Sequence, residues 1–147
     1  MTSLGCRRCP RVQATVALEA LTSQLDALLR TLMVEAPVGM LGLWAATRYG
    51  SWGRRSGESP AALWRMLLLV IGCSLITHPF AWWSNRGLAP MMPFATRAAL
   101  IELAVVVVEA VLLRGGLLLR WRAALTTSLV MNMASFGYGL WLISQDP

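Results

Sequence analysis

Four apolar segments, each about as long as a bilayer is thick, dominate this chain of 147 residues. They cover residues 29–49, 63–83, 93–113 and 123–143, and short polar stretches such as "GSWGRRSGESP" separate them. A helix needs ~20 apolar residues to cross a ~30 Å hydrocarbon layer. Only 14% of the residues are charged, against roughly 25% in soluble domains. The pattern predicts an all-α, polytopic membrane protein built as a bundle of four transmembrane helices.

The aromatic and basic residues agree with this prediction. Tryptophans and tyrosines lie mostly near the segment ends, as in the aromatic belts of membrane proteins. All 13 basic residues are arginines, and they stand singly or in pairs between the apolar segments. We therefore expect contacts with lipid headgroups and no nucleic-acid partner. We expect a multi-pass protein of a bacterial inner (plasma) membrane with both termini on one side, while the arginines leave open which side that is.

A different pattern precedes the first apolar segment. Residues 1–13 are expected to form a basic, flexible tail. Across residues 14–32 the leucines then recur three and four positions apart, at Leu18, Leu21, Leu25, Leu28 and Leu32. This heptad spacing predicts an amphipathic helix that binds a second copy of the chain or a membrane-protein partner, or that lies on the membrane surface. Alternatively, this helix simply extends the first span outward.

The three cysteines give little indication of a cofactor. Cys6 and Cys9 form a single CxxC in the tail, which supplies only half of a tetrahedral zinc site. Cys73 lies inside an apolar segment and is interpreted as a small packing residue. We expect that no cofactor is required.

Each apolar segment carries one stripe of small or polar residues. Positions i, i+4, i+7 and i+11 of a helix share a face. The stripes are Glu35–Gly39–Gly42–Ala46, Ile71–Ser74–His78, Glu102–Glu109 and Ser128–Asn132–Ser135–Gly139. Small residues allow helices to approach closely, and polar residues form hydrogen bonds between them. We therefore expect the four stripes to face the bundle interior.

The depth of each polar residue follows from the helical rise of ~1.5 Å per residue. Glu35 and His78 are predicted to lie in the leaflet nearer the termini, and Glu102 and Asn132 near the midplane. Glu109 and Ser128 are predicted to lie level with each other in the opposite leaflet. Together with Ser135, these residues predict a polar pathway through much of the membrane.

An ionised carboxylate at such depth costs ~2.5 kcal/mol or more on insertion scales, so we expect these glutamates to be protonated, paired or hydrated. Structural ion pairs are the simplest alternative to a functional site. The candidate pairs are Glu35 with Arg30 or with residues of the tail, Glu102 with Arg97, and Glu109 with Arg114.

His78 is the only histidine, and Pro79 follows it. Proline disfavours helical geometry at the residue before it, so the helix is expected to loosen at His78. A loosened turn would free carbonyl groups for a cation, whereas a plain helix end would place the ring among the headgroups.

No GxSxG, HExxH, P-loop or dinucleotide-binding motif occurs in the chain. Glu35, His78 and Glu102 are also candidate ligands for a divalent metal. Three functions follow from these observations. The first is proton- or cation-coupled transport along the polar pathway, in a homo-oligomer. The second is an accessory subunit that binds a larger membrane complex through residues 14–32. The third is a metal-dependent membrane enzyme acting on a lipidic substrate.

Overall fold

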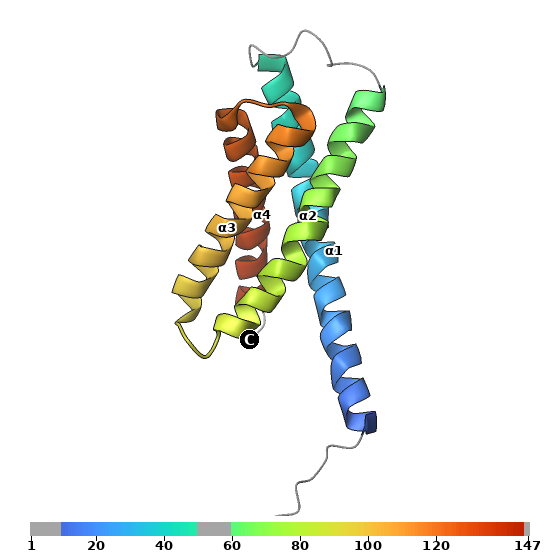
Figure 1. Cartoon of the computed structure of the whole chain (residues 1–147), viewed down its shortest axis with the longest axis vertical. Coiled ribbons are helices and arrows are strands. Elements are labelled where there is room, and N and C mark those ends of the chain that lie inside the picture. The colour runs from blue at the N-terminus through green and yellow to red at the C-terminus, as the bar shows by residue number, and fades with distance from the viewer. Residues whose placement is uncertain (1–9, 50–59, 146–147) are drawn as a thin grey trace, which may run out of the picture.

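The computed structural model describes residues 10–49 and 60–145, which form four helices. They are α1 (Pro10–Tyr49), α2 (Pro60–Leu88), α3 (Phe94–Leu117) and α4 (Trp121–Gln145). The chain runs up and down through them in order, and α4 closes the ring against α1 (Figure 1). The predicted all-α four-helix bundle is confirmed, and each predicted apolar segment coincides with part of one helix.

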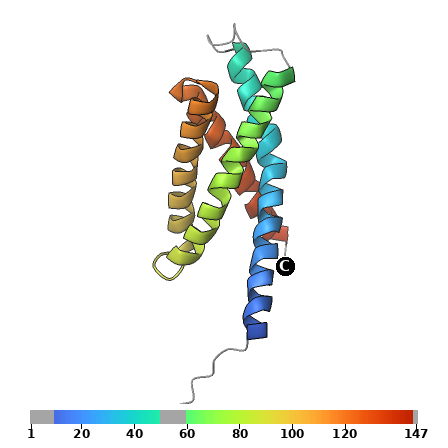
Figure 2. The same ribbon diagram turned by 45° about the vertical axis from the view of Figure 1, so that its right-hand side comes forward.

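The predicted helix over residues 14–32 is the N-terminal part of α1. It continues without a break into the first apolar segment, and its lower turns extend beyond the other three helices (Figures 1 and 2). Two leucines of the heptad stripe, Leu21 and Leu25, are 52% and 48% exposed. Residues 14–32 and the first apolar segment are therefore parts of one continuous helix. Cys6, Cys9 and most of the predicted tail lie outside the described residues, although α1 already begins at Pro10.

α2 does not loosen at His78, and in this respect the prediction was wrong. The helix passes through Pro79 and ends only at Leu88. Proline removes one backbone donor and restricts its neighbour, but packing along both sides of a long helix can override this local preference. His78 therefore lies in a continuous helix and not beside an opened turn.

The connection between α3 and α4 is shorter than the apolar pattern indicated. Gly115 and Gly116 remain helical, and the turn falls at Leu118, which has a left-handed conformation (φ 54°). The Arg65 guanidinium donates a hydrogen bond of 2.8 Å to the carbonyl oxygen of Gly116. This bond satisfies one of the carbonyls that a helix end leaves without a partner.

The apolar core fills the half of the bundle nearer the α3–α4 turn. Its buried members come from all four helices and from the α3–α4 turn: Leu43, Met66, Val70, Cys73, Ala110, Leu113, Leu119, Ala124 and Met131. Gly39 lies close to it, because a Cβ at this position would approach the Met131 sulfur to 2.7 Å and Val70 Cγ1 to 3.0 Å. The small-residue stripe of α1 thus faces inward as predicted, and Cys73 is a packing residue.

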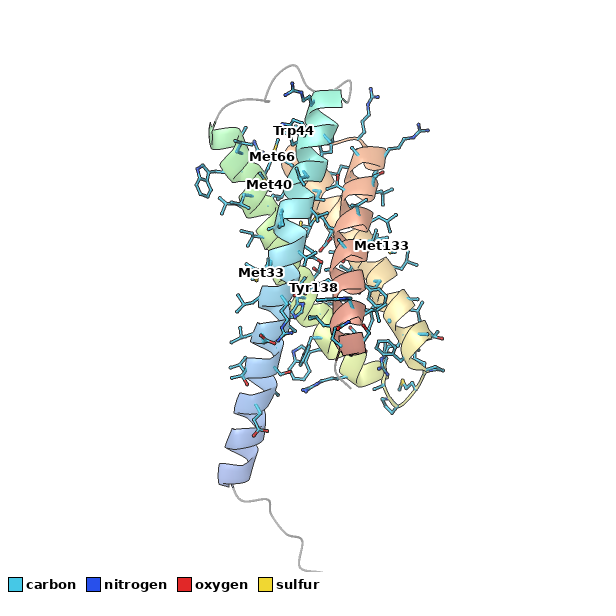
Figure 3. All side chains as sticks on the ribbon, turned by 180° about the vertical axis from the view of Figure 1, so that it is seen from behind. Met33, Met40, Trp44, Met66, Met133 and Tyr138 are labelled. Atoms are coloured by element: carbon cyan, nitrogen blue, oxygen red, sulfur yellow. The ribbon has the colours of Figure 1, made fainter. Side chains whose placement is uncertain are left out.

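Large apolar side chains project from the outside of the bundle along most of its length (Figure 3). Met33 and Met133, for example, are 79% and 63% exposed. Two of the described helices are long and apolar enough to cross a membrane, over Glu19–Ala46 and Ala62–Leu88.

Candidate functional site

A cavity of about 250 Å³ lies between the four helices. Most of the residues that the sequence predicted for the polar pathway line it. It extends to Asn85 and Phe94, which flank the α2–α3 turn. Its polar lining comes from all four helices: Thr31, Glu35, Ser74, Thr77, His78, Asn85, Glu102, Asn132 and Ser135. Glu35, His78, Glu102 and Asn132 therefore line one cavity, although each comes from a different helix.

Glu35 reaches this cavity from α1, and its side chain is held between two hydroxyl groups. It is 3% exposed. One carboxylate oxygen accepts a 2.7 Å hydrogen bond from Ser74 on α2, and the other accepts a 2.7 Å bond from Ser135 on α4. Glu35 thus joins three helices through its two oxygens.

Glu109 lies deeper and is completely buried. Its Oε2 accepts hydrogen bonds from Asn132 Nδ2 at 2.6 Å and from the Ser128 hydroxyl at 3.0 Å. Its Oε1 lies 3.1 Å from the Thr77 hydroxyl on α2. The predicted alignment of Glu109 with Ser128 is confirmed. Asn132 bonds to Glu109, although depth alone placed it beside Glu102.

Glu102 and His78 have fewer partners. Within the described part of the chain, the Glu102 carboxylate has neither a hydrogen bond nor an ion pair. The His78 ring stacks on Trp82 with centroids 6.5 Å apart, and its buried Nε2 has no hydrogen-bond partner there either. His78 forms no hydrogen bond with Glu35 or Glu102 among these residues. The three residues therefore share a cavity but no hydrogen bond.

A second, largely apolar cavity of about 580 Å³ lies between α3 and α4. It shares Phe94, Ala98, Glu102, Asn132 and Phe136 with the first cavity. Glu102 therefore stands where an apolar groove between two helices meets the polar interior.

The three candidate ion pairs are not formed among the described residues. Arg30 pairs with Asp26 at 2.9 Å instead of with Glu35. Arg97 donates to Asn85 at 2.6 Å. Arg114 lies over the Trp121 ring, 4.6 Å from its centroid. Each arginine thus has another partner, and these three predicted pairs are not formed. The tail residues that were the other candidate partners of Glu35 lie mostly outside the described residues.

The three glutamates are close enough to interact electrostatically. Burying several like charges without a cation is costly, so such a group binds protons or cations, or draws in water. A bound divalent metal is a weaker fit. Within residues 10–49 and 60–145, no three His, Cys, Asp or Glu side chains are grouped closely enough to hold one. The ligand set Glu35, His78 and Glu102 therefore lines one cavity without forming a metal site.

Ser74 belongs to the stripe of α2 that was expected to face inward, although no carboxylate partner was predicted for it, and the sequence pattern did not indicate Thr77. Both lie on the turn of α2 that contains His78, and their spacing places them on nearly the same face. A serine and a threonine within one helical turn of a histidine could have indicated these site residues in the sequence. Their hydroxyls turned out to contact the carboxylates, while the histidine does not.

Comparison of the chain with protein-family models, with curated proteins and with solved structures found no match.

Proposed function

We propose that this chain is a small integral membrane protein that moves protons or another small cation through its helix bundle. The observation that carries the proposal is the group of three interacting glutamates around and beneath the cavity, for which the described residues provide no cationic partner. Ionisable groups inside a membrane bundle mark ion pathways and proton relays, because their burial is otherwise costly.

The surface of the bundle supports its insertion in a bilayer. A soluble protein rarely exposes apolar patches larger than a few hundred Å², yet exposed leucines, valines and methionines cover the outside of all four helices. A core helix of a soluble protein would be mostly buried. In the most apolar stretches of the two candidate spans, only 17% and 28% of the residues are buried.

Arginine–aromatic contacts at both ends of the bundle support the same placement. Arg48 lies over Trp44 and Arg114 over Trp121 at one end. Two further contacts, Arg86–Trp82 and Arg97–Phe94, lie at the other. Along α3, a rise of ~1.5 Å per residue separates Arg97 from Arg114 by roughly 26 Å. Such a spacing matches two headgroup layers about 30 Å apart.

The arrangement of polar and apolar residues favours access from one end. The cavity extends to the α2–α3 turn and provides room for several water molecules. Beyond Glu109, α3 continues with Ala110 and Leu113, which are packed in the apolar core. Transport across the bundle would then require a second arrangement, in which the core opens and the cavity closes.

Proton or cation flux into liposomes tests this proposal. The purified protein is reconstituted, a membrane potential is imposed, and flux is followed with entrapped dyes for H⁺, Na⁺ and K⁺. We expect flux with the wild type and a drop of about tenfold or more, equal to ~1.4 kcal/mol in the barrier, for Glu102→Gln and Glu109→Gln. Glu19→Gln is the matched control, since Glu19 is exposed on the extension of α1. Absence of flux with all three ions, or full flux in both variants, would refute the proposal.

A specific observation also favours the accessory-subunit interpretation. The N-terminal part of α1 extends beyond the bundle with Leu21 and Leu25 half exposed. If this stripe binds a partner or a second copy, Leu21→Ser with Leu25→Ser should reduce the mass of the assembly purified in mild detergent. Leu29→Ser is the control, because Leu29 is 60% exposed but lies off the stripe. An unchanged mass would argue against this second function.

A further inference from the structure

Glu109 poses a question of access. It is completely buried and does not line the cavity. A proton that enters the cavity can reach Glu109 only through one of the side chains that contact its carboxylate. Those side chains are Thr77 on α2, and Ser128 and Asn132 on α4.

Two of the three are unsuited to carry a proton from the cavity. Ser128 is itself completely buried and does not touch the cavity. Asn132 does line the cavity, but its amide nitrogen donates both to Glu109 at 2.6 Å and to the Ser128 carbonyl at 2.9 Å. An amide group has two hydrogens, which these bonds occupy, and it has no hydroxyl to exchange them through.

Thr77 satisfies both requirements. Thr77 lines the cavity, and its hydroxyl oxygen lies 3.1 Å from Glu109 Oε1. The same oxygen lies 2.9 Å from the carbonyl oxygen of Cys73, one helical turn earlier. A hydroxyl group has one hydrogen to donate and lone pairs with which to accept. The Thr77 hydroxyl can therefore donate either to Glu109 or to Cys73 without losing all of its partners.

We infer that the Thr77 hydroxyl is the proton relay between the cavity and Glu109. This inference rests on the proposed function and specifies the proton as the ion that Glu109 binds. On uptake, a hydronium ion in the cavity gives a proton to Thr77 Oγ1, and the original hydroxyl hydrogen passes to the ionised Glu109 Oε1. The products are water, an intact threonine hydroxyl and a neutral glutamic acid, so atoms and charge balance.

The surroundings of Glu109 accommodate both states of its carboxyl group. When Glu109 is ionised, the hydroxyls of Thr77 and Ser128 donate to it. When it is protonated, its O–H donates to Thr77, whose hydrogen turns to the Cys73 carbonyl, and Ser128 turns to the Val106 carbonyl 3.1 Å away. No buried hydroxyl then lacks an acceptor in either state, which avoids the ~1–3 kcal/mol cost of an unsatisfied buried group.

The charged and titratable groups that face Glu109 come from three helices. Glu35 on α1 and Glu102 on α3 interact with it electrostatically, and Cys73 lies one turn from Thr77 on α2. Among the described residues, α4 contributes Ser128 and Asn132 but no charged group to this contact. No lysine, arginine or histidine in the described structure bonds to Glu109, so Thr77 is not bypassed by a basic side chain.

Glu35 provides an internal reference. It has the same kind of hydroxyl partners, but it lines the cavity itself. Its proton can therefore exchange directly with cavity water. Removing the Thr77 hydroxyl should affect Glu109 and spare Glu35.

The test is hydrogen–deuterium exchange of the protonated carboxyl bands, followed by infrared spectroscopy of the protein in lipid. Glu35→Gln and Glu109→Gln assign the two bands. We expect Thr77→Val, which keeps the shape and removes the hydroxyl, to slow exchange of the Glu109 band about tenfold or more, equivalent to ~1.4 kcal/mol in the barrier. The Glu35 band should keep its rate, and Thr77→Ser should exchange like the wild type.

Thr127→Val is the matched control, because Thr127 is also buried and contacts Gly42 rather than a carboxylate. Unchanged exchange of the Glu109 band in Thr77→Val, equal slowing in Thr127→Val, or no titratable band from Glu109 would overturn the inference. If Thr77→Val does not fold, the wild type decides: the relay requires the Glu109 band to exchange more slowly than the Glu35 band, and equal rates would overturn it.

The liposome assay separates this inference from the proposed function. Exchange that depends on Thr77 without flux of H⁺, Na⁺ or K⁺ would refute transport and retain the relay. Proton flux that is undiminished in Thr77→Val would refute the relay and retain transport.

Discussion

Replacing Asn132 with leucine should reveal how strongly α4 is held to α3 through the Glu109 carboxylate. Leucine has the same number of side-chain heavy atoms as asparagine, branched at the same position, but cannot donate a hydrogen bond. The substitution removes the 2.6 Å bond to Glu109 Oε2 and the 2.9 Å bond to the Ser128 carbonyl. Oε2 then keeps only the Ser128 hydroxyl at 3.0 Å as a donor.

The expected loss depends on the charge of Glu109. A hydrogen bond to a charged group contributes about 1.5–3 kcal/mol to the free energy of unfolding. A neutral hydrogen bond between membrane helices averages only about 0.6 kcal/mol. Because the Asn132 amide stabilises the ionised carboxylate more than the neutral acid, the destabilisation by Asn132→Leu should increase with pH as Glu109 releases its proton.

The assay is reversible unfolding in mixed micelles, monitored by helical circular dichroism at several pH values. Asn132→Leu is measured alone and together with Glu109→Gln, which keeps an acceptor oxygen but cannot ionise. We expect the cost of Asn132→Leu to fall to about 0.6 kcal/mol and to lose its pH dependence in the Glu109→Gln background. Met133→Leu, at an exposed neighbouring position, should have almost no effect. An equal cost in both backgrounds at every pH would refute the reasoning.

Three further predictions concern packing and surface charge. Gly39→Leu should lower the free energy of unfolding by about 1–3 kcal/mol through overpacking, because a Cβ at this position already approaches Val70 Cγ1 to 3.0 Å. Unfolding in mixed micelles checks this prediction. A variant as stable as the wild type would contradict it. Cys73, 1% exposed, should resist maleimide labelling in the folded protein when the other two cysteines are serine; rapid labelling would mean that the core opens readily. Asp26→Asn should change the stability by less than about 1 kcal/mol, because its ion pair with Arg30 is more than half exposed; a larger loss in the same unfolding assay would contradict this.

The helical period made the inward-facing stripes predictable. Gly39 and Gly42 approach other helices, and Glu35, Asn132 and Ser135 share one cavity, as a spacing of three and four residues requires. That Glu109 and Ser128 lie at the same height in the bundle also followed from counting residues. Antiparallel helices have the same rise per residue, and the connections limit how far one helix can slide past another.

The partners of each polar group were not predictable in the same way. Successive residues on a helix point about 100° apart, so the rotation of α2 about its axis decides whether Thr77 or His78 faces Glu109. That rotation depends on the packing of the whole α2 surface against α1 and α3. For the same reason Arg97 contacts an amide and Arg114 contacts an aromatic ring, instead of the glutamates nearest to them in sequence.

Local signals at the helix ends were likewise decided by tertiary contacts. The preference of Pro79 and of the Gly115–Gly116 pair for a break is worth about 1–3 kcal/mol, and packing of α2 and α3 over their full length outweighs it. The amino-acid sequence by itself determined four helices and their inward faces, because these follow from composition and a fixed helical period. Only the tertiary structure decided which hydroxyl meets which carboxylate, because that depends on how four helices rotate and slide to fill their common interior.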